Sequence, residues 1–181
     1  SIKIDKEERG KMYKTIPRSS VIGFLIGVLP GAGATIASFL AYGMERNLVK
    51  DEEKEKFGKG SVNGLSAPET ANNAACSGSF VPMLTLGIPG SGTTAVMLGA
   101  LLGFGIQPGP RLYMTNPEIF WSVIMSMYIG MVILLILNLP LIPYIARILA
   151  VPKNYLIPLI LFFSITGIYV MSFNNFDIYL M

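Results

Sequence analysis

The chain has 181 residues, of which 52% are hydrophobic and only 14% are charged, and its formal net charge is +3. With a mean hydropathy of +0.56, this composition is typical of a membrane protein and unlike that of a soluble domain. The chain has no histidine and a single cysteine, Cys76, which excludes histidine acid–base catalysis, the usual zinc sites and an internal disulfide framework.

Charged residues are concentrated near the start of the chain. Residues 1–59 hold 11 Lys/Arg and 8 Asp/Glu, whereas residues 60–181 hold three of each. Basic clusters beside apolar runs indicate cytoplasmic flanks near anionic lipid, and they do not resemble a nucleic-acid-binding surface. Residues 1–18 are predicted to form an interfacial or linker segment.

Residues 19–42 form an uncharged run that is interrupted at Pro30–Gly33. Both flanks are rich in Lys and Arg, so both are predicted to be cytoplasmic, which makes the run a re-entrant hairpin. Each leg has about ten residues and reaches about 15 Å, half the thickness of a hydrocarbon core of about 30 Å. A kinked single span is the alternative, and it would also place the interruption near the membrane centre.

Residues 43–60 are predicted to form a charged, solvated cytoplasmic loop, because they carry five Lys/Arg and five Asp/Glu between two glycines. Residues 61–104 are predicted to contain a helix of small residues, suited to close packing, followed by a second broken transmembrane helix. The second interruption falls in "GIPGSG", residues 87–92.

The remaining segments complete the prediction of an all-α, polytopic integral membrane protein with re-entrant or discontinuous helices. Sheets are excluded because the apolar runs are too long for strands and lack alternation. The predicted segments are a loop at 105–118, a transmembrane helix at 119–138, a proline-bearing connection at 139–154, a transmembrane helix at 155–173 and a truncated end at 174–181. We expect the chain to be a fragment of a larger protein.

Two stretches share a pattern: "LPGAGATIASF" at Leu29–Phe39 and "IPGSGTTAVML" at Ile88–Leu98 both read Pro, Gly, x, Gly, x, Thr. Proline and glycine break helices, and the backbone groups freed in lipid must be satisfied by protein, water or ligand. Two such breaks at corresponding positions indicate a transporter binding site. The restarting helix offers N–H groups to an anion, whereas carbonyls of the preceding half-helix suit a cation such as Na⁺.

The substrate-binding residues predicted on this basis are Gly31, Ala32, Gly33, Thr35, Asn72, Asn73, Gly90, Ser91, Gly92, Thr93 and Thr94, with Pro30 and Pro89 breaking the helices and a sodium site near Thr35, Ser38 and Thr94. Simple kinks are the alternative interpretation. A nucleotide loop is disfavoured, because "GIPGSGTT" lacks the lysine that would hold phosphates.

Glu69 is an isolated carboxylate in the weakly polar "APETANNAA" stretch. It is interpreted either as an intramembrane acid with a function or as a first-turn residue favoured by the helix dipole at the membrane surface. The amides of Asn72 and Asn73 either line the substrate site or connect helices.

Three motifs together resemble those of a known family. "GFLIGVLPGAGATIASFLAYGMER" and "GLSAPETANNAACSGSFVPMLTLGIPGSGTTAVMLGALLGFGIQPGP", with their spacing, are similar to part of the C-terminal half of the large membrane subunit of tripartite tricarboxylate transporters, the TctA family. "PGAGAT" at Pro30–Thr35 and "PGSGTT" at Pro89–Thr94 resemble the family's signature loops, and "APETANNAA" resembles a third.

This resemblance implies that the chain is half of a repeat-built secondary transporter. The transporter would be a carboxylate importer of the bacterial cytoplasmic (inner) membrane, driven by a cation gradient of Na⁺ or H⁺ and without a cofactor. It also implies three protein partners, namely a periplasmic solute-binding protein, a small membrane subunit and the N-terminal half of the same subunit. No nucleophile–base pair supports an enzyme. The alternative is a channel-like or scaffold protein whose re-entrant loops form a pore or only pack.

Overall fold

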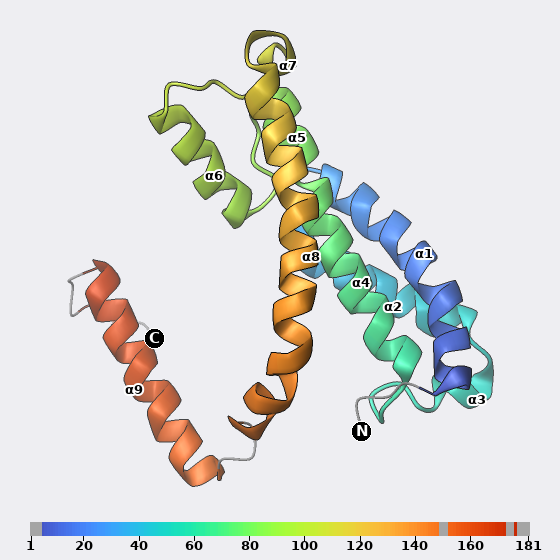
Figure 1. The fold of residues 1–181 in the computed structure, drawn as a ribbon. Coiled ribbons are helices and arrows are strands. Elements are labelled where there is room, and N and C mark those ends of the chain that lie inside the picture. The colour runs from blue at the N-terminus through green and yellow to red at the C-terminus, as the bar shows by residue number, and fades with distance from the viewer. Residues whose placement is uncertain (1–4, 149–151, 173–175, 177–181) are drawn as a thin grey trace. The chain divides into compact units, whose positions relative to one another are not determined.

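The chain is described by a computed structural model over residues 5–148, 152–172 and 176. Every regular element in these residues is a helix, which confirms the all-α prediction. The helices are α1 (Lys6–Val28), α2 (Gly33–Leu48), α3 (Asp51–Lys54), α4 (Val62–Gly78), α5 (Phe80–Leu86), α6 (Gly92–Gly103), α7 (Leu112–Thr115), α8 (Pro117–Ile148) and α9 (Lys153–Ser172) (Figure 1). The predicted end at 174–181 lies outside the described residues apart from Phe176.

The helices divide into two compact units, Ser1–Val123 and Ile124–Met181. In the first unit, α1, α2 and α4 pack against one another and form most of the contacts between elements. The second unit contains the rest of α8 and α9. Both candidate loops and all predicted site residues belong to the first unit.

Helix α1 begins inside the segment predicted as an interfacial or linker region. Asp5 caps its N-terminus in a capping box with Glu8, so residues from Lys6 onward are helical despite Pro17. The helix ends at Val28, because a residue that precedes proline disfavours the helical conformation and Pro30 follows Leu29. The chain therefore leaves the helix where the sequence places the first interruption.

Helix α2 returns along α1, so that the two form a helical hairpin. Gly31 and Gly33 have φ angles of +83° and +67°, a region that is strained for other residues, and they allow the tight reversal. At the far end of the hairpin the side chains of Thr15 and Glu45, 30 residues apart, are hydrogen-bonded.

Helix α4 packs against α1 at unusually close range. A Cβ built on Gly23 or Gly27 would overlap the carbonyl oxygen of Ala71 or Ala75 and lie 2.6 Å from the corresponding Cα. Only glycine fits at these two positions of α1. The prediction that the small residues of 61–79 pack tightly against neighbouring helices is confirmed.

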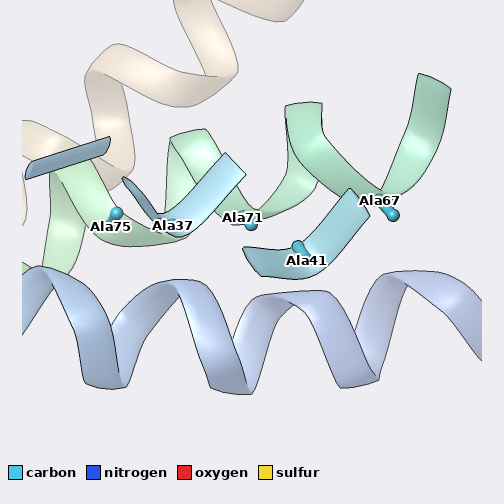
Figure 2. Close-up of a cluster of buried hydrophobic side chains, with 5 residues drawn as sticks. All are labelled: Ala37, Ala41, Ala67, Ala71 and Ala75. Atoms are coloured by element: carbon cyan, nitrogen blue, oxygen red, sulfur yellow. The ribbon is translucent and has the colours of Figure 1, made fainter. Parts of the chain in front are cut away.

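The main cluster of buried hydrophobic side chains in the first unit consists of five alanines. Ala37 and Ala41 of α2 meet Ala67, Ala71 and Ala75 of α4, as Figure 2 shows, and all five are at most 1% exposed. The alanines recur every fourth residue, so they form a stripe along one face of each helix. Small side chains let three backbones approach closely, which is the packing mode of helices in lipid.

The segment predicted as a charged loop is partly helical. Helix α2 continues to Leu48, and α3 supplies one further short turn. The prediction of a solvated connector is wrong for Glu45, which is completely buried, because position 45 continues the same four-residue stripe as Ala37 and Ala41.

Helix α8 runs further than the sequence predicts. The predicted helix stops at residue 138, whereas α8 passes through Pro140 and Pro143 to Ile148. Helices tolerate internal prolines when other groups form hydrogen bonds with the freed carbonyls. A proline therefore does not have to end a helix. Its segment Pro117–Ala146 is the one described helix long and apolar enough to cross a membrane, and Gly92–Gly103 and Asn154–Val170 are shorter apolar helices.

Candidate functional site

The two interruptions come together in space. One cavity of about 600 Å³ is lined by residues from both of them. The first interruption and the start of α2 contribute residues 31–35, and the second interruption and the start of α6 contribute residues 89–92 and 95, namely Gly31, Ala32, Gly33, Ala34, Thr35, Pro89, Gly90, Ser91, Gly92 and Ala95. We refer to this space as the paired-break cavity.

Two helices begin at the paired-break cavity. Helix α2 begins at Gly33, and its N-cap residue Ala32 makes no side-chain capping hydrogen bond. Helix α6 begins at Gly92, where Ser91 accepts a hydrogen bond from the backbone N–H of Thr94. Both N-termini carry free N–H groups and the positive end of a helix dipole, so the cavity wall favours a negatively charged ligand.

Charged side chains do not line the paired-break cavity. Its lining consists of glycines, alanines, one proline and the hydroxyl residues Thr35 and Ser91. A ligand there would be held by backbone N–H groups and hydroxyls. Such a wall suits a carboxylate, which accepts several hydrogen bonds through each oxygen.

Two glycines of the cavity wall, Gly90 and Gly92, have different surroundings. A Cβ on Gly90 would lie 2.9 Å from Cβ of Ser79 and 3.4 Å from the carbonyl oxygen of Gly27, so Gly90 seats the second break against the junction of α4 and α5 and the end of α1. Gly92, by contrast, has free space around it and an ordinary helical backbone. Gly92 is therefore the wall position that accepts a larger side chain without backbone strain.

A second cavity of about 430 Å³ adjoins the first through a shared residue. It is lined by Thr35, Ser38, Phe39, Tyr42, Pro68 and Asn72, from α2 and α4. The Ser38 hydroxyl lies 3.0 Å from the carbonyl oxygen of Ala34 and 3.1 Å from that of Pro68. Thr35, Ser38 and Asn72 thus border one space, whereas the sequence analysis assigned Asn72 to the substrate and Ser38 to the sodium ion.

Several predicted residues do not line either cavity. The hydroxyl of Thr94 is buried and lies 2.8 Å from the backbone nitrogen of Ser91, within the cap of α6. The amide of Asn73 donates to the carbonyl oxygen of Glu69 at 2.9 Å on the exposed face of α4. Pro30 and Thr93 are exposed and also lie outside the two linings.

Glu69 is exposed in the middle of α4. The interpretation of Glu69 as a first-turn residue is wrong, because α4 begins at Val62. Ser61 caps the helix by accepting a hydrogen bond from the N–H of Gly64, and Pro68 lies in the helix interior. One of the two interpretations of Glu69 placed the helix start at Pro68. The helix instead starts after its cap residue Ser61, seven residues earlier.

A buried polar cluster was missed by the sequence analysis. The carboxylate of Glu45 accepts hydrogen bonds from Thr15 at 2.7 Å, from Arg18 at 2.7 Å to each oxygen, and from Asn63 at 2.9 Å. We call these four residues the Glu45 cluster. Its members come from α1, α2 and α4, and three of them, Thr15, Glu45 and Asn63, continue the small-residue stripes of those helices at the same four-residue spacing. That spacing is the signal by which the sequence could have revealed it.

The fold and the two cavities define a class of protein: an all-helical protein with an apolar helix of membrane-spanning length and two broken helices that meet at a cavity without charged side chains. The sequence model of the Tripartite tricarboxylate transporter TctA family matches residues 1–181. The chain belongs to this family.

Two curated relatives from Agrobacterium vitis are similar to the chain. One, an uncharacterized 52.8 kDa protein in the TAR-I ttuC′ 3′ region, is 43% identical over 97% of this chain and 35% of its own length. The other, an uncharacterized protein in the TAR-II ttuC′ 3′ region, is 46% identical over 87% of this chain and 64% of its own length. The chain therefore spans about a third of the length of the first relative and about two thirds of the length of the second. No solved structure matches it.

Proposed function

We infer from family membership that the chain is a membrane component of a tricarboxylate transporter, with a role in transport and not in catalysis. We propose that the chain is part of the large membrane subunit of a cation-coupled, binding-protein-dependent importer of tricarboxylates or related carboxylates. The protein would lie in the bacterial cytoplasmic membrane as a multi-pass subunit. Its partners would be a small membrane subunit, a periplasmic solute-binding protein and the remaining part of the same large subunit.

The observation that carries this proposal is the convergence of two helix N-termini on the paired-break cavity. In lipid, broken helices persist where their free backbone groups line a cavity, and N-terminal helix ends suit anionic substrate groups. The wall residues that we assign to carboxylate binding are Gly31, Ala32, Gly33, Thr35, Gly90, Ser91 and Gly92, with the amide of Asn72 in the adjoining space.

Coupling requires a second ligand of opposite charge. We assign the cation to the space beside Thr35 and Ser38, where a threonine hydroxyl, a serine hydroxyl and the amide of Asn72 supply oxygen atoms. Na⁺ is a hard cation and prefers oxygen ligands. Because Thr35 borders both cavities, a cation and a carboxylate bound there would attract each other.

Uptake into proteoliposomes tests the proposal. The intact large subunit is reconstituted with the small membrane subunit, and the binding protein is added with labelled citrate outside. Uptake is expected to saturate and to require an inward gradient of Na⁺ or H⁺. Equal uptake without either gradient would contradict coupling and would favour a passive, channel-like protein, because a pore conducts down the solute gradient alone.

A further inference from the structure

A third cavity, of about 550 Å³, lies at the other end of α1 and α2 from the paired breaks. Five basic residues line it, Lys11, Lys14, Arg18, Lys50 and Lys56, together with three glutamates. We call it the basic cavity. It is separate from the proposed carboxylate site, since the linings of the two spaces share no residue.

Two of the three glutamates of the basic cavity are paired with its lysines. The third, Glu52, is exposed and has no ion pair in the described part of the chain, so it offsets one of the unpaired positive charges. Glu53 lies 3.1 Å from Lys11 and 3.3 Å from Lys56, and Glu7 lies 3.2 Å from Lys11. The hydrogen bond from Lys11 lowers the pKa of the Glu53 carboxyl group, so that Glu53 stays ionised and the pairs persist near neutral pH.

Two further lysines of the cavity, Lys14 and Lys50, have no ion-pair partner in the described part of the chain, and both are exposed. The basic cavity therefore has positive charge available for an anion. An anionic ligand could bind there without breaking an existing pair.

A buried acceptor also adjoins the basic cavity. Asn63 is 5% exposed, and its amide nitrogen donates to Thr15 and Glu45 at 2.9 Å. Its carbonyl oxygen Oδ1 has no hydrogen-bond partner among the described residues. A buried oxygen of this kind is stabilised by a donor such as a hydroxyl group. Oδ1 itself has almost no accessible surface, so it does not contact a ligand in the cavity unless neighbouring side chains move.

Apolar surface borders the basic cavity. Leu48 and Val49 are part of its lining, and Leu48 is 55% exposed. Further along α1, Val21 and Leu25 are 60% and 59% exposed. The cavity thus lies where the charged end of the hairpin meets its apolar surface, the position at which a lipid headgroup meets its acyl chains in a bilayer.

We propose that the basic cavity binds the headgroup of an anionic phospholipid of the phosphatidylglycerol type. Lys14 and Lys50 bind the phosphate, and an acyl chain lies along Leu48. The choice of a lipid over free phosphate follows from the apolar border, since inorganic phosphate has no acyl chain. This inference relies on the membrane setting proposed above and is independent of the transported substrate.

Lipid binding to the full-length subunit in detergent tests the inference. Phosphatidylglycerol and phosphatidylcholine are titrated separately, and bound lipid is counted by native mass spectrometry. The variant K14Q/K50Q is expected to bind phosphatidylglycerol about thirtyfold more weakly, because each lysine near an anionic headgroup contributes a factor of about five. The matched control R9Q/K59Q removes the same charge from exposed positions outside the cavity and should bind like the parent.

Three outcomes would overturn the proposal. The first is an equal loss of phosphatidylglycerol binding in both double variants, and the second is equal binding of the two lipids by the parent. The third is competition by inorganic phosphate as effective as that by the lipid, which would indicate a free-phosphate site. Lipid binding is measured without transport, so the two proposals fail separately. A subunit that binds phosphatidylglycerol through Lys14 and Lys50 but takes up no citrate would contradict the proposed function only.

Discussion

The Glu45 carboxylate is completely buried and is bound by side chains of two other helices. Removing it by Glu45→Ala leaves the Arg18 guanidinium without its ion-pair partner and the Asn63 amide with one acceptor fewer. Breaking a fully buried pair on one side costs about 3–5 kcal/mol, and the cost here should fall below that range because the Arg18 side chain is 36% exposed and water partly solvates its charge. We expect a markedly lower melting temperature of the full-length subunit in detergent.

The matched control for Glu45 is Glu55→Ala, which removes an exposed glutamate ten positions further along the chain and should leave the melting temperature nearly unchanged. The double variant R18L/E45L removes both charges and should cost less than the sum of the two single changes. Equal melting temperatures of Glu45→Ala and Glu55→Ala would contradict the importance of the Glu45 cluster.

Gly92 offers the cleanest test of the paired-break cavity. Gly92→Leu places a side chain in open space at a helical position, so the variant should fold. Carboxylate uptake should fall below detection, because the leucine occupies the N-terminal end of α6. Gly33→Leu should also abolish uptake, but Gly33 has a φ of +67° and the variant would be strained. Normal uptake by a folded Gly92→Leu would refute the site.

The contact between α1 and α4 depends on glycine. Gly27→Ala introduces a Cβ that overlaps the backbone of Ala75, so the two helices must separate and the change should cost about 1–3 kcal/mol or more. Gly10→Ala is the control in the same helix. It has nothing within 4 Å and should stabilise α1 by about 0.5–1 kcal/mol, since alanine favours helix. A lower melting temperature for Gly27→Ala and a higher one for Gly10→Ala would verify this packing. An unchanged melting temperature for Gly27→Ala would contradict it.

Glu53 connects three helices at the charged end of the unit. It lies in α3, accepts hydrogen bonds from Lys11 of α1 at 3.1 Å and from Ser61, the cap of α4, at 3.3 Å, and has a pKa lowered mainly by Lys11. A carboxyl group whose pKa is lower in the folded state stabilises that state above its unfolded pKa, near 4.5. The stabilisation disappears as the pH falls through the lower, folded-state value.

Hydrogen exchange can measure this pH dependence. At about pH 7, Glu53→Gln should exchange faster than the parent at amides 51–61, after correction for intrinsic rates. As the pH falls through the lowered folded-state pKa, the parent and the variant should converge, because Glu53 then becomes protonated in the folded as well as in the locally opened state. Glu55→Gln serves as an exposed control without effect. A difference that persists at low pH would show that charge is not the cause.

The arrangement of the hairpin in the membrane is open to a labelling test. In the structure, Lys11 and Glu53 are paired, so the start of α1 and the segment after α2 lie at the same end of the hairpin. If the hairpin is re-entrant, single cysteines at Met12 and Lys50, with Cys76 replaced by serine, should both react with an impermeant thiol reagent from the cytoplasmic side only. Reaction from opposite sides would establish a kinked span.

The helix interruptions were predictable because their causes are local. Pro30 and Gly87 act on their own stretches of backbone wherever the helices lie, and Ser91 caps α6 through residues three positions away. The all-helical class follows equally from the length and composition of the apolar runs. Two local signals gave wrong predictions. Pro68 and Pro140 were interpreted as helix boundaries, but both lie inside helices.

Contacts between distant segments could not be read from the chain in this way. The meeting of the two breaks in one cavity, the burial of Glu45 and the lysines of the basic cavity all depend on how α1, α2 and α4 pack. That packing is decided by shape, where Gly23 and Gly27 admit the backbone of α4, and not by the propensity of any one segment. Thus local chemistry along the sequence sets where each helix breaks, whereas only the close approach of three small-residue stripes brings the breaks together, because the energy of a packed contact exists only once both partners are in place.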